Sequence, residues 1–209
     1  MGQYYKPVII DENNKVTHWW YSHDCKSDFK DCYGNIYTSG TGLKLMEHSW
    51  RKNPFVGNVA EFLLNNPHRV VWAGDYADTE KDVKQNLYEL AEPKTELSIP
   101  HYPLVIRGHK QINGDGEYIY VASDADMKIR YAVNFDKKEF VAFDKLPNKD
   151  GWQMHALPLL TVEGNGRGGG DYHSEDKLVG SWARDKIATC RFKKDIPKGF
   201  TEIFPQFKE

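Results

Sequence analysis

The chain predicts an α+β fold with a largely antiparallel β-sheet and a few short helices clustered in the first half. Apolar residues at helical spacing occur mainly before residue 93, whereas short β-type runs separated by turn residues follow from about residue 103. Aromatic side chains make up 13% of the 209 residues, which is typical of strand-rich proteins. No linker of unusual composition divides the chain, so we expect a single α+β domain over residues 1–209.

A hairpin opens the chain and short helices follow it. Two β-type runs flank a turn rich in Asn and Asp, at residues 7–10 and 16–21, and this pattern is typical of a hairpin. Apolar residues at helical spacing predict two helices, over residues 43–50 and 54–63. Pro67 lies just beyond the second helix and cannot continue it.

A strand and a third helix complete the first half. The apolar run at residues 69–73 predicts a buried strand that ends at Gly74. Thr79 followed by Asp82 resembles a capping box, which predicts that a third helix begins there and ends before Pro93.

β-type runs dominate the second half. They are short apolar or aromatic stretches separated by turn residues, at residues 104–106, 117–122, 129–134, 139–143, 178–183 and 187–192. A longer apolar run at residues 152–162 contains Pro158, so we expect an edge strand or a bend there. Cys190 alternates with polar residues in the last run and is expected in the core.

Composition excludes several classes of function. The formal net charge is -2, so no overall field favours nucleic acid or an anionic membrane, and we expect no bulk nucleic-acid binding. No apolar run approaches the ~18 residues of a membrane helix. Three scattered cysteines form no disulfide framework, and the first residues resemble no signal peptide. We therefore expect a cytoplasmic protein without a membrane partner.

The most unusual segment is a run of five glycines within seven residues, at residues 164–170. Glycine runs bring bare backbone N–H groups together, and such nests hold anions. Arg167 within the run suits bidentate contact with phosphate or carboxylate. The run formally satisfies the G-x-G-x-x-G dinucleotide fingerprint. Acidic and strand-like residues follow where that fold requires a helix, so we exclude a Rossmann site.

We expect this run to bind, sequester or turn over a small phosphorylated or nucleotide-like ligand. Asp75 and Asp171 would accept hydrogen bonds from ribose or base groups, and Tyr172 or a tryptophan would stack on a base. If a reaction occurs, His173 is the candidate catalytic acid or base, because an imidazole titrates near neutrality. The expected ligand-binding residues are Gly164, Asn165, Gly166, Arg167, Gly168, Gly169, Gly170, Asp171, Tyr172 and Asp75.

Three other interpretations stay open. In the first, the glycine run is only a connection, and Asp75 is a turn or helix-capping residue. In the second, the chain is a protein-interaction module of inhibitor or immunity type that uses exposed aromatic side chains. In the third, pairs such as His23-Asp24 serve a metal-dependent hydrolase. No such pair has the spacing of a metal site, so we expect no metal ligand and no cofactor.

Three stretches of the chain, at residues 42–50, 70–78 and 157–172, resemble a group of uncharacterised bacterial and phage-borne proteins. This resemblance covers most of the chain but brings no established activity and no functional residue with it. It implies an intracellular setting linked to phages or other mobile elements. Nucleotide-signal binders, immunity proteins and inhibitors of defence systems are plausible functions in that setting.

Overall fold

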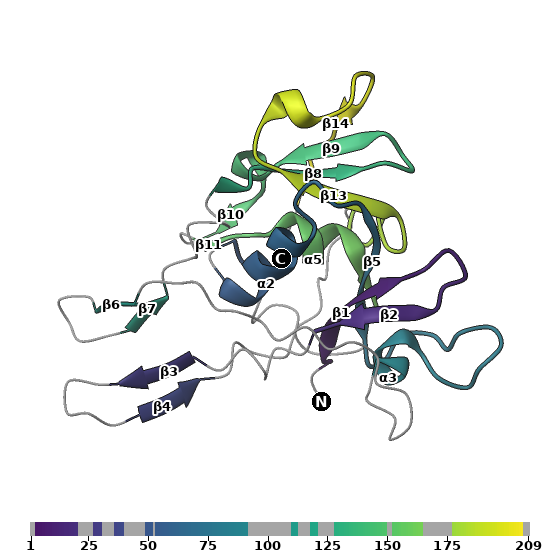
Figure 1. Cartoon of the computed structure of the whole chain (residues 1–209), viewed down its shortest axis with the longest axis horizontal. Helices are drawn as coiled ribbons and strands as arrows, with labels where there is room; N and C mark the ends of the chain where they lie inside the picture. Colours follow the sequence, from purple (N-terminus) through teal and green to yellow (C-terminus); the bar gives the residue numbers. More distant parts are fainter. Residues whose placement is uncertain are drawn as a thin grey trace.

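The computed structural model describes residues 3–20, 27–30, 36–39, 49–51, 53–91, 110–112, 118–120, 128–149, 152–164 and 177–206. In these ranges the chain forms a mixed sheet of eight strands with a few helices, and most neighbouring strands are antiparallel (Figure 1). The predicted α+β class and the largely antiparallel sheet are confirmed at this level.

The main sheet has the strand order β14–β9–β8–β13–β5–β1–β2, and β12 pairs with β5 outside this path. Its strands are β1 (Tyr5–Ile10), β2 (Val16–Trp19), β5 (His68–Gly74), β8 (Tyr131–Asn134), β9 (Glu139–Ala142), β12 (Val162–Glu163), β13 (Lys186–Cys190) and β14 (Thr201–Glu202). Only the pairs β12–β5 and β14–β9 are parallel among these neighbours. The predicted hairpin at the start of the chain is present as β1 and β2.

Three two-stranded ribbons stand apart from this sheet in the strand pairing. They are β3 (Ser27–Lys30) with β4 (Ile36–Ser39), β6 (Lys110–Ile112) with β7 (Tyr118–Tyr120), and β10 (Asn148–Lys149) with β11 (Trp152–Gln153). The expected strand at residues 104–106 and residues 43–48 of the first expected helix lie outside the described residues. Trp50, at the expected end of that helix, forms an isolated bridge with Met154 instead.

The described helical segments are distributed over both halves of the chain. They are α2 (Pro54–Phe62), α3 (Leu87–Leu90), the 3-10 turn η2 (Phe143–Lys145), α5 (Ala156–Thr161) and the 3-10 turn η3 (Lys193–Asp195). The expected clustering of helices in the first half is therefore wrong. The helix predicted after residue 53 is confirmed as α2, whose N-terminus is capped where the Asn53 side chain accepts a hydrogen bond from the Phe55 N–H, at 2.9 Å.

The apolar run that contains Pro158 is a buried helix rather than the expected edge strand or bend. Pro158 occupies the third position of α5, where a missing N–H costs little because the first N–H groups of a helix have no intrahelical acceptor. His155 caps the helix, and its Nδ1 accepts a hydrogen bond from the Leu157 N–H, at 3.2 Å. All six residues of α5 are buried, so no polar face distinguishes this helix from a strand in the sequence.

The third expected helix begins later than Thr79 and is short. Asn86 is the actual cap of α3: its side chain accepts from the Glu89 N–H at 3.0 Å, and the Glu89 carboxylate accepts from the Asn86 N–H at 3.1 Å. The Asn86 amide also donates to the carbonyl of Asp75, at 3.0 Å. Asn86 and Glu89 therefore form a complete capping box at the start of α3, and the Asn86 amide ties this helix to the end of β5. No helix begins at Thr79, where the expected partner was the shorter Asp82.

Residues 178–183 form consecutive turns instead of the expected strand. Gly180 adopts a left-handed conformation with φ of 70°, and its N–H donates to the Leu159 carbonyl at 3.0 Å. An added Cβ on Gly180 would lie 2.6 Å from the carbonyl oxygen of Val162. Glycine is therefore required both for the turn and for its close approach to β12.

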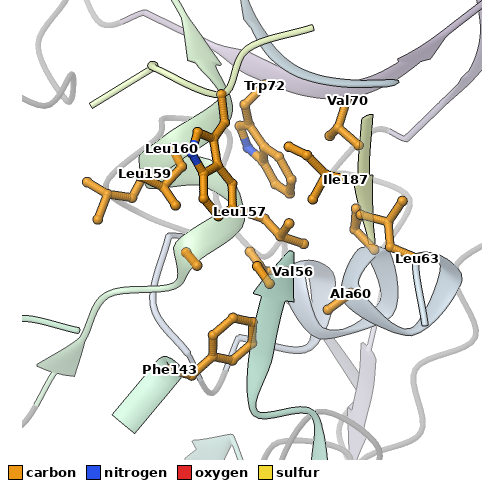
Figure 2. Packing of buried hydrophobic residues seen from close by; sticks show 14 of the residues in the cluster. Val56, Ala60, Leu63, Val70, Trp72, Phe143, Leu157, Leu159, Leu160 and Ile187 are labelled. Carbon is orange, nitrogen blue, oxygen red and sulfur yellow. The ribbon is translucent and has the colours of Figure 1, made fainter. Parts of the chain in front are cut away.

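Side chains alternate between the two faces of the sheet. On β5, Val70 and Trp72 join the main core beneath α2 and α5, whereas Val71 and Ala73 face the opposite side and pack with α3 residues. Figure 2 shows Trp72 and Ile187 directed toward side chains of α2 and α5. Cys190 lies on the opposite face, as expected of a core residue: it is 3% exposed, and burial raises the pKa of its thiol to about 11.

Candidate functional site

The glycine run begins beside the end of β5. Strands β5 and β12 are parallel, with Val162 opposite Trp72 and Glu163 opposite Ala73. Their carboxyl ends therefore open on the same edge of the sheet. Continuing this register sets Gly164, the first residue of the run, beside Gly74.

Two buried side chains from the start of the chain pack against both glycines. Gln3 and Tyr5 are 0% and 1% exposed. A Cβ on Gly164 would lie 2.6 Å from the Tyr5 hydroxyl and 2.8 Å from Gln3 Nε2, and a Cβ on Gly74 would clash with the same two side chains. Both positions therefore require glycine because the strand ends and β1 approach closely. Packing alone explains the first glycine of the run.

Asp75 lies at this edge and has a defined structural role. Its Oδ1 accepts a hydrogen bond from the Tyr4 N–H at 3.0 Å, and its own N–H donates to the Tyr4 carbonyl at 3.0 Å. Its carbonyl accepts from the Asn86 side chain. These bonds fix Asp75 as the turn residue that one of the open interpretations described, and they direct its half-buried carboxylate to the backbone just before β1.

An arginine that the sequence did not single out occupies the same edge. The Arg184 guanidinium donates to Glu163 at 2.9 and 2.6 Å, and to Glu80 at 3.0 and 2.5 Å. The three side chains are 17–29% exposed, so the ion pairs are partly shielded from water. Hydrogen bonds to Glu80 and then to Glu163 raise the pKa of Arg184. All three guanidinium nitrogens are engaged by these two carboxylates.

No local signal in the sequence could have found this arrangement. Arg184 takes a left-handed backbone conformation with φ of 70°, which is uncommon for a residue other than glycine. Its partner Glu80 lies far away in the chain, on the connection between β5 and α3. The contact depends on the tertiary fold.

Of the expected ligand-binding residues, the structure describes Gly164 and Asp75 and brings them to one edge. The others and the expected catalytic residue lie outside the described residues: Asn165, Gly166, Arg167, Gly168, Gly169, Gly170, Asp171, Tyr172 and His173. Within the described ranges, no three His, Cys, Asp or Glu side chains are grouped to hold a metal ion. Nor does any helix in the described part of the chain have the length and apolar character to cross a membrane.

Two half-buried histidines form a second titratable group, away from the expected site. The rings of His18 and His68 lie 5.6 and 5.0 Å from the ring of Phe62, and 6.3 Å from each other. Burial lowers the pKa of both imidazoles. A smaller contribution in the same direction comes from His68 for His18, and from Lys186 for His68.

Comparison of the chain with protein-family models, with curated proteins and with solved structures finds no match. The resemblance to phage-borne proteins therefore stays an expectation, and the function has to be argued from the edge itself.

Proposed function

We propose that the chain binds a small phosphorylated or nucleotide-like ligand at the edge where β5 and β12 end. The supporting observation is the parallel pairing of these strands, which brings Asp75 and the start of the glycine run together. In open α/β sheets, ligands bind beyond the carboxyl ends of the parallel strands, and the proposal extends this rule to the short parallel pair of β5 and β12. The sequence supplies five glycines and Arg167 from this point onward.

In this proposal, backbone N–H groups of the run and the Arg167 guanidinium hold the phosphate. Asp75 accepts hydrogen bonds from ribose hydroxyls or base amines, since a carboxylate offers about four acceptor positions. Tyr172 stacks on the base. If the ligand is also cleaved, His173 transfers the proton.

The ion pairs at Arg184 reduce the repulsion that an anion would meet at this position. Glu163 directly precedes the run, and its carboxylate would repel an incoming phosphate. Arg184 donates two hydrogen bonds to Glu163 and offsets part of that repulsion, although its charge is shared with Glu80. Removing the guanidinium would therefore weaken phosphate binding without deleting a ligand contact.

The test is a thermal-shift panel of nucleoside mono-, di- and triphosphates, cyclic nucleotides and NAD. A ligand at 100 times its Kd stabilises the folded state by about 2.7 kcal/mol, which corresponds to a rise in Tm of roughly 5–10 °C. Arg167→Ala should abolish the shift, and Lys15→Ala, which removes an exposed charge from the β1–β2 turn, should retain it. An unchanged Tm with every compound would refute the proposal. Co-purification of a stoichiometric protein would then favour the interaction module.

A further inference from the structure

Charge is divided unevenly along the chain. The described segments 128–149 and 177–206 carry thirteen Lys and Arg residues against six Asp and Glu, whereas the rest of the chain carries fifteen against twenty-four. These two segments contain β8, β9, β10, β13, β14 and the 3-10 turns η2 and η3. At physiological salt, charges act over about 8 Å, so the overall charge of -2 does not cancel a local positive surface.

Figure 1 shows β14 at one end of the sheet. Part of this positive charge gathers there. The Lys145 and Lys193 ammonium groups both approach the Glu202 carboxylate, at 2.6 and 3.7 Å. Backbone hydrogen bonds join the adjoining segments: the Arg130 N–H donates to the Cys190 carbonyl and the Phe143 N–H to the Arg130 carbonyl. Segments distant in sequence therefore meet here.

Two large aromatic side chains in this region are exposed. Phe192 is 58% exposed and Phe204 is 51% exposed. Each carries a lysine over its ring: Lys194 Nζ lies 5.4 Å from the Phe192 centroid, and Lys145 Nζ lies 5.0 Å from the Phe204 centroid. We call the set Lys145, Phe192, Lys193, Lys194 and Phe204 the lysine–phenylalanine cluster.

We propose that the lysine–phenylalanine cluster binds single-stranded nucleic acid. Its lysines contact phosphates as exposed point charges, and Phe192 and Phe204 offer flat faces on which bases stack. A binding site for unpaired strands combines these two features, positive charge and accessible aromatic rings. Lysine is depleted at protein–protein interfaces, so its abundance here favours a nucleic acid over a protein partner. This site is independent of the edge formed by β5 and β12.

The proposal refines the expectation drawn from net charge. A charge of -2 argues against a field that collects duplex nucleic acid over the whole surface. It does not argue against a small site that reads a few nucleotides of a single strand, because such a site depends on local charge and stacking.

Binding is measured by fluorescence anisotropy of labelled single-stranded DNA and RNA of about a dozen nucleotides, a length within the range bound by single domains. We expect a Kd in the micromolar range at low salt. The logarithm of the binding constant should fall with the logarithm of salt concentration with a slope of about -2, corresponding to three phosphates neutralised. Comparison of the affinities for DNA and for RNA shows which sugar is preferred.

Two double variants separate charge from stacking. Lys193→Glu/Lys194→Glu should abolish detectable binding. Phe192→Ala/Phe204→Ala should weaken binding by about tenfold or more, while the salt slope is retained. The matched control is Lys81→Glu/Lys84→Glu, which makes the same change in net charge at exposed positions between β5 and α3 and should bind like the original chain. Circular dichroism and Tm verify that each variant is folded.

Several results would overturn the proposal. The first is that neither DNA nor RNA binds at protein concentrations of about 100 μM, which is the weak limit of non-specific association. The second is that the lysine variant of the cluster and the control variant lose the same amount of affinity. Equal affinity for heparin, with no effect of the phenylalanine variant, would show a site for polyanions without base stacking. Binding to vesicles containing phosphatidylserine but not to nucleic acid would assign the cluster to a membrane surface.

Discussion

The sheet contains two short parallel pairs, and each short strand ends in a glutamate. Glu163 ends β12 beside β5, and Glu202 ends β14 beside β9. Glu163 receives two hydrogen bonds from a partly buried arginine, whereas Glu202 faces two exposed lysines, which are 47% and 66% exposed. The same residue type, at the end of an equally short strand, is thus held by a planar guanidinium in one pair and by two exposed ammonium groups in the other.

This difference makes the β5–β12 edge rigid and the β9–β14 edge adaptable. At the β5–β12 edge, buried side chains lie so close to the glycines that a Cβ at either position would force them to shift. At the β9–β14 edge, the lysines and phenylalanines are exposed, so little packing restricts their rotamers. A precise site for a small ligand suits the first edge, and a tolerant site for a flexible strand suits the second.

The largest effect is expected from crowding the rigid edge. Gly74→Ala places a Cβ 2.8 Å from Tyr5 Cε1 and 3.1 Å from the Glu163 carbonyl oxygen, so we expect a loss of about 3 kcal/mol in the free energy of unfolding, measured by urea denaturation. The control is Gly199→Ala, where nothing lies within 4 Å and only the positive φ of 85° costs about 1 kcal/mol. Equal losses in the two variants would show that close approach is not what selects glycine at residue 74.

The second effect concerns the arginine fork. Arg184→Ala leaves Glu80 and Glu163 together without their cation, and we expect a loss of about 2 kcal/mol in the free energy of unfolding. Arg184→Lys should recover only part of this, because an ammonium group cannot make the bidentate contacts. Chemical denaturation near neutral pH measures both variants. A fully stable Arg184→Ala variant would remove the proposed rigidity of this edge.

The third expected effect is a dependence of stability on pH, which comes from His18 on β2 and His68 on β5. The pKa values of His18 and His68 are lower in the folded chain than the ordinary value of about 6.5. The unfolded chain therefore binds more protons, and stability falls as the pH decreases through this value. We expect a lower Tm at pH 5.5 than at pH 7.5.

The double variant His18→Gln/His68→Gln tests the assignment of this pH dependence. It should reduce the difference in Tm between the two pH values, since the lowered imidazole pKa values are then absent. An unchanged difference would mean that other groups titrate in this range.

The smallest effect is expected at the adaptable edge. Lys145→Ala removes an ion pair whose lysine is 47% exposed, and such pairs contribute about 0.5 kcal/mol. Raising the salt concentration should diminish even this difference, because exposed charges are screened. A loss of stability as large as that of Arg184→Ala would show that the glutamates of the two parallel pairs are held equally strongly.

Local patterns predicted the elements whose signal lies within a few residues. The hairpin of β1 and β2, the helix α2 and the strand β5 follow from turn residues, a proline at the helix start and a continuous apolar run. The helix α5 could not be recognised in this way, because burial on all sides removes the alternation of polar and apolar faces.

The candidate site was only partly predictable for a different reason. Composition alone singles out the glycine run. Its proximity to Asp75 in space depends on the pairing of β12 with β5, two strands that lie far apart in the sequence. The same holds for Arg184, whose two carboxylates come from the connection between β5 and α3 and from β12. Such contacts are set by topology, so no window along the chain contains them.

The wedge formed by Gln3 and Tyr5 has a consequence for the order of folding. These side chains fill the space between residues 74 and 164, so three segments spread over most of the chain must meet before the wedge is buried. Contacts of such high sequence separation carry a large loop-closure cost and tend to form slowly. We therefore expect the native contacts of the rigid edge to form late in folding. A ligand that binds at this edge would then bind only to chains that have completed folding.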